Sequence, residues 1–235
     1  MDGIAGSLRT VLEEIADTCQ KAGRPDGSVK LIAVSKTFPS CLIQEAFDAG
    51  QVAFGESKWQ EASPKIAGLP GSIEWHFIGR IQRNKVRKIL DSFHVIHAVD
   101  SVKLARYIAE VGREIGISPK IFLQVNVGGE ASKGGFEPEA FELGMADLLE
   151  IQGLKILGLM TIPPAGPDAE ASRKWFSDLR ALKELIESRF DTRLPFLSMG
   201  MSGDYRVAIE EGATHVRVGS AIFGGRAYRV DGELG

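Results

Sequence analysis

Lys36 is the residue whose position could support covalent chemistry. It follows the apolar run 31–34, which predicts a short strand buried on both faces, as in parallel sheets. Binding and catalytic groups of parallel α/β proteins collect at the carboxyl ends of the strands. The surroundings of a lysine there can lower its pKa, so that a neutral amine attacks a carbonyl carbon and forms a Schiff base. Alternatively, the stem of Lys36 covers apolar surface while its ammonium group reaches water.

A second region, LSMGMSGDYRVAIEEGATHVRVGS at 197–220, could bind an anion. Glycines and serines follow two predicted strands, at 198–203 and 219–220, and each group opens a predicted helix. Glycines there let backbone N–H groups approach a ligand, and a helix N-terminus favours negative charge. We therefore expect a phosphate between Ser202 and the pair Gly219 and Ser220. The alternative is that these glycines only form tight turns.

Arg217 stands two residues before the second of these turns. It could contact the ring of a ligand whose phosphate lies in the turn, or it could pair with Glu210 or Glu211. In a closed barrel, the ends of strands seven and eight lie beside the end of strand one, where Lys36 stands. A phosphorylated aldehyde bound there would meet a lysine amine, and pyridoxal 5′-phosphate (PLP) is such a cofactor.

An alternation of short apolar strands and amphipathic helices must position these residues. Strands are predicted at 30–35, 52–54, 74–78, 95–98, 120–127, 154–160, 195–198 and 215–218. Helices are predicted at 7–22 with Ser7 as N-cap, 40–49, before Gly68, 82–90, 101–115 with Ser101 as cap, 138–149, 169–188 and 204–211. Eight such units fit one closed (β/α)₈ barrel of the TIM type over residues 1–235. A doubly wound open sheet is the alternative fold.

Composition excludes several classes of protein. The formal net charge of −3 gives no general argument for binding nucleic acid or anionic membranes, and the basic run 80–88 lacks interleaved aromatic residues. Neither the two cysteines nor the histidines have the spacing of a metal site. The N-terminal residues do not resemble a signal peptide, and no apolar run has the length of a membrane span. We therefore expect a cytoplasmic protein with no metal.

Long motifs occur in order along nearly the whole chain. They are AVSKTFP at 33–39, FGES at 54–57 with QE at 60–61, WHFIG at 75–79 with Q82 and NK at 84–85, QVN at 124–126 with E130, SK at 132–133 and G135, GLM at 158–160 with IPP at 162–164, LSMGMS at 197–202 with D204, and VRVGSAIFG at 216–224 with R226. In these motifs the chain resembles the pyridoxal phosphate homeostasis proteins, the YggS/PROSC family. These are single-domain relatives of the alanine racemase N-terminal barrel, PLP fold type III.

The resemblance implies roles for individual residues. The Schiff-base lysine of the family falls on Lys36, the phosphate contacts fall on Ser202, Gly219 and Ser220, and the arginine that faces the pyridine nitrogen falls on Arg217. The chain departs from the family at two positions. Ser57 replaces the usual asparagine, which puts any contact of that asparagine in doubt, and Arg80 replaces an uncharged residue.

Further candidates are weaker. His76 and Asn126 are each predicted either to contact the cofactor or to fill the interior, and Met199 is a candidate cofactor contact whose simplest role is packing. Lys133, in a glycine-rich loop with Glu130, is either a second amine that hands over cofactor or a solvated loop residue.

By resemblance, the protein takes part in intracellular PLP (vitamin B6) homeostasis and affects amino-acid and keto-acid balance indirectly. PLP-dependent apo-enzymes are the expected recipients, and we expect a monomer. Efficient catalysis is not expected, because an arginine at the pyridine nitrogen weakens the ring as an electron sink, and no tyrosine of the chain is an evident opposing base. The alternatives are a racemase-like PLP enzyme and an aldolase that uses Lys36 directly on a sugar phosphate.

Overall fold

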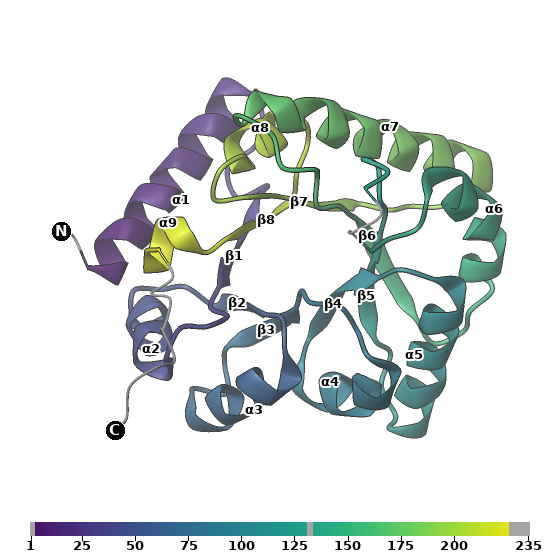
Figure 1. Ribbon diagram of the computed structural model, residues 1–235, viewed down its shortest axis with the longest axis horizontal. Helices are drawn as coiled ribbons and strands as arrows, with labels where there is room; N and C mark the ends of the chain where they lie inside the picture. Colours follow the sequence, from purple (N-terminus) through teal and green to yellow (C-terminus); the bar gives the residue numbers. More distant parts are fainter. Residues whose placement is uncertain (1–2, 131–133, 226–235) are drawn as a thin grey trace, which may run out of the picture.

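The chain forms a closed barrel of parallel strands. The computed structural model describes residues 3–130 and 134–225. The strands follow one another around the barrel in chain order, and β8 pairs with β1 to close it (Figure 1). Their bounds are β1 Lys30–Val34, β2 Ala53–Glu56, β3 Glu74–Phe77, β4 Val95–Val99, β5 Lys120–Gln124, β6 Lys155–Met160, β7 Phe196–Met201 and β8 His215–Val218. The predicted TIM barrel is confirmed, and the doubly wound alternative is wrong.

Helices surround the barrel as an outer ring (Figure 1). The α-helices are α1 Ile4–Lys21, α2 Ser40–Asp48, α3 Trp59–Gly68, α4 Val86–Ser92, α5 Val102–Glu114, α6 Pro138–Leu149, α7 Arg173–Phe190, α8 Tyr205–Glu210 and α9 Ser220–Phe223. Two short 3₁₀ helices, η1 Arg83–Lys85 and η2 Glu170–Ser172, precede α4 and α7. Apolar residues of the helices pack on the outward faces of the strands and form one continuous core.

The helix ends show where local rules succeed and fail. Ser101 caps α5 as predicted, since its hydroxyl accepts a hydrogen bond from the Leu104 N–H at 3.2 Å. The prediction of Ser7 as the first cap is wrong: α1 begins at Ile4, after Gly3. The Ile4 N–H donates instead to Glu45 Oε1 of α2 at 3.2 Å. The free N–H at the start of α1 is therefore hydrogen-bonded by a residue distant in the sequence, and not by a local cap.

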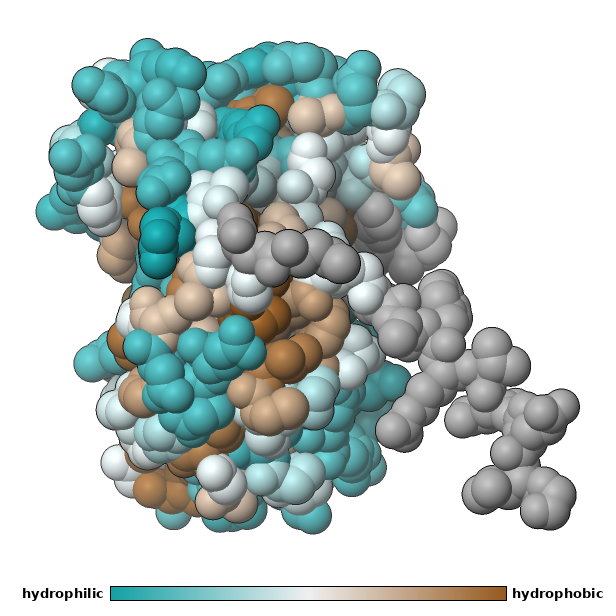
Figure 2. Space-filling view, turned by 90° about the vertical axis from the view of Figure 1, so that its left-hand side faces the viewer, coloured by the Kyte–Doolittle hydropathy of each residue, from teal (hydrophilic) through white to brown (hydrophobic). Residues whose placement is uncertain are grey.

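The side of the barrel at which α1, α2 and α9 lie is shown in Figure 2. Hydrophilic residues cover its upper part, and apolar residues gather near its centre. Ile4 of α1 and Leu42 of α2 are partly buried residues that pack on the core. Within the described ranges, no helix combines the length and apolar character needed to cross a bilayer.

The interior of the barrel is unusually polar. His97 of β4 stacks on Phe122 of β5 with ring centroids 4.5 Å apart, and both rings contact His215 of β8. Because β4 and β8 are four strands apart in a closed barrel of eight, they face each other across it, and these contacts lie in its interior. His76 and Arg217 are buried there as well. Three of the four histidines of the chain thus lie inside the fold.

These buried histidines make stability sensitive to acid. Burial lowers the pKa of His76, lowers that of His97 well below its ordinary value, and lowers that of His215 to about 3. Below about pH 6.5 the unfolded chain binds protons that the folded chain does not, so the free energy of unfolding falls as pH falls. We expect each histidine to remove up to about 2 kcal/mol between pH 7 and pH 5, measured by urea unfolding at both pH values.

His215→Gln should reduce this acid sensitivity by about 2 kcal/mol. The control is Ser188→Ala, at an exposed position of α7, which should leave the acid sensitivity unchanged. Burial also raises the pKa of Glu56. The folded chain therefore takes up a proton at Glu56 more readily than the unfolded chain does, which opposes the loss of stability caused by the histidines. A free energy of unfolding that stays constant from pH 7 to pH 5 would contradict the neutral state of the interior histidines.

Candidate functional site

A cavity of about 280 Å³ opens at the carboxyl mouth of the barrel. Small-molecule pockets begin at roughly this size. Its lining includes five of the residues singled out from the sequence: Lys36, Ser202, Arg217, Gly219 and Ser220. The remaining lining residues are Val34, Phe38, Ile78, Ile162, Met201, Gly203 and Gly224. Segments from both ends of the chain therefore meet around one cavity, with cationic and hydroxyl groups against an apolar wall.

The turn that carries Lys36 is held from both sides. Thr37, the next residue, has a φ of +71°, a left-handed conformation that is unfavourable for a β-branched residue. Its N–H donates a hydrogen bond to the Glu61 carboxylate of α3. Phe38 stacks on Phe223 of α9, with ring centroids 5.1 Å apart. These contacts hold the half-buried Lys36 side chain at the cavity in a turn that would not form by local preference.

A buried ion cluster lies under this turn. Lys65 of α3 uses its three ammonium protons on three oxygens: the Ser35 carbonyl at 3.1 Å, Glu56 Oε1 at 2.8 Å and Glu61 Oε1 at 3.0 Å. The Ser35 hydroxyl also donates to Glu56 Oε1 at 2.7 Å. Burial raises the pKa of Glu56, and the hydrogen bond from Lys65 opposes that rise. The cluster thereby ties the backbone before Lys36 to β2 and α3.

The two glycine–serine turns meet at one oxygen atom. Ser202 Oγ accepts hydrogen bonds from the backbone N–H of Gly219 at 3.1 Å and of Ala221 at 3.5 Å. Gly219 also lies close to β1, since a Cβ atom there would be 3.2 Å from the Val34 carbonyl oxygen. Backbone donors that converge on one oxygen are what a phosphate requires. The absence of a side chain at Gly219 lets the strand and the turn approach each other.

Asp204 fixes the turn that carries Ser202. Its Oδ1 accepts the Met201 N–H at 2.7 Å, and its Oδ2 accepts the Ser172 hydroxyl at 2.9 Å. Gly200, in the strand before the turn, has a φ of +91°, and a Cβ atom there would lie 2.6 Å from Ala208 Cβ. The turn is therefore shaped by close packing on α8 and by one carboxylate.

Arg217 is buried at the base of the cavity. Its Nη1 donates to Ser198 Oγ at 2.7 Å, and its Nη2 donates to the Thr161 carbonyl at 2.9 Å. Burial lowers its pKa to about 10, so the guanidinium stays protonated at neutral pH. The Ser198 hydroxyl and the Thr161 carbonyl are neutral, and the cavity therefore carries a buried positive charge that favours an anionic or electron-rich ligand.

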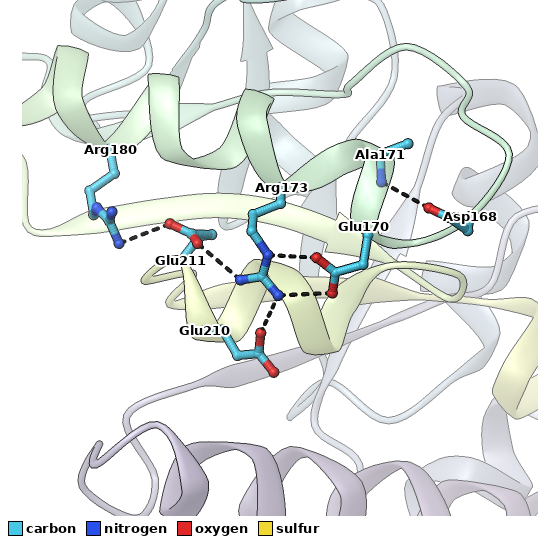
Figure 3. A network of polar contacts seen from close by, with 7 residues as sticks. All are labelled: Asp168, Glu170, Ala171, Arg173, Arg180, Glu210 and Glu211. Atoms are coloured by element: carbon cyan, nitrogen blue, oxygen red, sulfur yellow. Dashed lines mark hydrogen bonds and ion pairs between the residues drawn. The ribbon is translucent and has the colours of Figure 1, made fainter.

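The alternative partners of Arg217 are excluded. Glu210 and Glu211 pair instead with Arg173 of α7, at 2.6 Å and 3.0 Å (Figure 3). Arg173 also binds Glu170, and Glu211 receives a second ion pair from Arg180 at 3.0 Å. This network joins α7 to α8 outside the barrel. The alternative in which Arg217 pairs with either glutamate is wrong, because both carboxylates bind Arg173 and Arg217 donates to Ser198 and Thr161.

Three further candidates lie away from the cavity lining. His76 is buried in the barrel, where its Nδ1 lies 2.8 Å from His97 Nε2. Asn126 follows β5, and its amide donates to the Glu130 carbonyl at 3.2 Å and to Glu137 Oε1 at 3.1 Å. Met199 is fully buried in the core between barrel and helices. Lys133 falls outside the described residues.

Sequence reasoning missed the residues that support the site. The sequence analysis uses FGES and QE only as family motifs, yet Glu56 accepts the Ser35 hydroxyl on one side of Lys36 and Glu61 accepts the Thr37 N–H on the other. The spacing of Glu61 and Lys65, four residues apart on a helix, is a signal that could have predicted their pairing. Ser198 and His97 gave no signal, because only the closed barrel brings β4 and β7 into contact.

Comparison with known proteins places this geometry in a family. Residues 8–227 match the family model of the alanine racemase N-terminal domain. A pyridoxal phosphate homeostasis protein from Aquifex aeolicus is 43% identical over 222 residues, which cover 94% of this chain and 97% of the relative. The chain belongs to the pyridoxal phosphate homeostasis protein family.

Solved structures agree with this assignment. The structure of PipY from Synechococcus elongatus with PLP bound has a TM-score of 0.78 and 38% identity, and the match covers 89% of this chain and all of PipY. An alanine racemase from Clostridium difficile, 14% identical, matches with a TM-score of 0.70 over 96% of this chain and 58% of the racemase, and shares the barrel fold.

The cluster under the Lys36 turn generates a prediction. Lys65→Met removes three hydrogen bonds and leaves the Glu56 charge buried without its partner. We expect the free energy of unfolding to fall by about 3–5 kcal/mol, measured by urea unfolding at pH 7. Lys58→Met, at an exposed position one residue before α3, should change it by less than about 0.5 kcal/mol. Equal effects of the two substitutions would show that the buried cluster is not what stabilises the turn.

Proposed function

We propose that this protein binds PLP at the carboxyl mouth of the barrel, with the cofactor as a Schiff base on Lys36. The observation that carries the proposal is the convergence of Lys36, Arg217 and the two glycine–serine turns on one cavity. The similarity to PipY, solved with PLP bound, supports the same ligand. Four further cavities lined by described residues lack this combination of an amine, an anion cradle and a buried cation.

The residues present fit the two ends of this ligand. The Ser202 and Ser220 hydroxyls offer donors to a phosphate, and the Gly219 N–H, which donates to Ser202 Oγ in this structure, would become a further donor if the Ser202 side chain turned away. Arg217 offers a donor to the pyridine nitrogen. Phe38 and Ile162 provide apolar surface for a flat ring. Hydrogen bonds to charged groups contribute more than neutral ones, so the phosphate contacts should dominate affinity.

Lys36 would provide the covalent anchor. The lysine nitrogen would hold the aldehyde carbon of the cofactor as a Schiff base in place of the aldehyde oxygen, which would be released as water. The bound cofactor would supply an electrophilic ring that can withdraw electrons. The braced turn around Thr37 limits how far the Lys36 stem can move, which favours one position of the amine.

The presence of Arg217 favours a protein that binds PLP without using it for efficient catalysis. A guanidinium keeps its proton, so it favours an unprotonated pyridine nitrogen and a weaker electron sink. The protein would therefore buffer or deliver PLP, and it would affect amino-acid and keto-acid balance through PLP-dependent recipients. The relatives are named as homeostasis proteins, which is consistent with this role. We further propose that the protein acts in the cytoplasm as a monomer.

The binding proposal can be tested by titrating the protein with PLP and following visible absorption. We expect a yellow complex whose Kd rises at least about 10-fold in Ser202→Ala, because a hydrogen bond to a charged group is lost. Lys36→Ala should abolish the absorption band of the imine. Ser188→Ala, at an exposed position of α7, is the matched control and should bind as the native protein does. A native protein that stays colourless with excess PLP would refute the proposal.

The holding role predicts negligible amino-acid turnover. The PLP-loaded protein, incubated with L-alanine, should form D-alanine and pyruvate far more slowly than the roughly 1–10³ s⁻¹ of ordinary enzymes. Chiral chromatography and a pyruvate assay measure the two products. Turnover in that range, abolished by Lys36→Ala, would favour the racemase-like alternative. A colourless protein that instead consumes a sugar phosphate would favour the aldolase alternative.

A further inference from the structure

A chain of polar contacts crosses the barrel from the cavity to the opposite mouth. Arg217 Nη1 lies 2.7 Å from Ser198 Oγ, which lies 2.9 Å from His97 Nδ1. His97 Nε2 lies 2.8 Å from His76 Nδ1. His76 Nε2 lies 3.2 Å from Glu74 Oε1, and the other Glu74 oxygen binds Lys30.

The two ends of the chain lie in different surroundings. Lys30 and Glu74 are the first residues of β1 and β3, so they mark the amino-terminal mouth, where both side chains are partly exposed. Arg217 lines the cavity at the carboxyl mouth and is 4% exposed. Between them, His76, His97 and Ser198 are completely buried. The chain therefore joins the candidate cofactor site to solvent on the other side of the molecule.

The donors of this chain all point the same way, and the carboxylate end decides which way. Glu74 can only accept, so the His76 Nε2 that faces it carries the proton, and His76 Nδ1 accepts from His97 Nε2. His97 Nδ1 is then bare and accepts the Ser198 hydroxyl proton. Arg217, which can only donate, gives a proton to Ser198 Oγ and is compatible with this order, but it does not impose the order, because a hydroxyl oxygen can accept two hydrogen bonds.

The reverse order of donors is unfavourable at the Glu74 end. If His76 carried its proton on Nδ1 instead, the bare lone pair of Nε2 would face the anionic Glu74, and the Ser198 hydroxyl would lose its acceptor. The Nε2 contact with Glu74, at 3.2 Å, does not meet the geometry of a hydrogen bond, so the carboxylate acts on His76 through its charge. The carboxylate at this end thus determines the tautomers of both histidines.

We propose that Glu74 is a positioning residue for Arg217, acting through the fixed tautomers of His76 and His97. The inference rests on the proposed function in what Arg217 contacts, but the order of the chain is a property of the protein by itself. With Nη1 held by Ser198 and Nη2 by the Thr161 carbonyl, the guanidinium plane is fixed, and its remaining donors are available to the cavity. Hydrogen bonds in such chains strengthen one another in a low-dielectric interior.

The tautomers can be measured directly on the protein without cofactor. Long-range ¹H–¹⁵N spectra of ¹⁵N-histidine protein distinguish a protonated ring nitrogen from a bare one, and only four histidines need assignment, by single His→Gln variants. We expect His76 and His97 to be neutral and protonated on Nε2 at pH 7. A proton on Nδ1 of either ring would overturn the proposal, whatever the protein binds.

Variants of Glu74 test whether the chain reaches the site. Glu74→Leu removes the acceptor, so the His76 tautomer should change. The Kd for PLP should rise roughly 3- to 10-fold, in the range of coupling within one hydrogen-bond network, and the absorption band of the complex should shift. Glu74→Gln retains an amide oxygen and should preserve tautomers, Kd and absorption band. Lys30→Met leaves the chain intact and should preserve the tautomers.

The outcomes separate the two proposals. Equal weakening by Glu74→Leu and Glu74→Gln, or no change in either, would show that Glu74 does not position Arg217. If Glu74→Leu does not fold, the wild-type tautomers and the Glu74→Gln complex still decide the question. Failure of the native protein to bind PLP would refute the proposed function, while the tautomer spectra would still report on the chain.

Discussion

The pairing of β8 with β1 is the constraint on which the rest of the structure depends. It runs from Lys30 opposite His215 to Ala33 opposite Val218 and closes the barrel. The same register places the turn after β8 beside the end of β1, so that Gly219 lies against Val34 and both line the cavity with Lys36. Without closure, the amine and the anion cradle would have no common site, because each element supplies only part of it.

A buried positive charge is the second feature that organises the molecule. Arg217 lies in a low-dielectric interior on neutral oxygens, and burial already lowers its pKa. An interior of this kind requires compensation, which a polar chain of histidines and an anionic ligand can provide together. The barrel interior therefore contains polar serine and histidine side chains at positions where many barrels have apolar ones. The same histidines, kept neutral by burial, make the fold acid-sensitive.

Local sequence patterns predict the strands and helices better than they predict the residues that hold Lys36 and Arg217 in place. Eight apolar runs separated by amphipathic segments were enough for the barrel, since strand and helix periods are local. Lys36 and the glycine–serine turns were predictable because the carboxyl ends of parallel strands share one mouth. The contacts of Glu61 with Thr37, of Ser198 with His97 and of Glu45 with Ile4 were not, since each joins distant segments whose approach only the folded barrel defines.

Borohydride reduction of the PLP-treated protein, followed by peptide mapping, tests the central claim most directly. Reduction turns a C=N bond into a stable amine, so the pyridoxyl group stays on the residue that held the cofactor. The account predicts one modified peptide, with the added mass on Lys36 at about one group per chain. Modification spread over several surface lysines, or concentrated on a lysine outside the cavity, would contradict it and leave Lys36 as a structural residue at the barrel mouth.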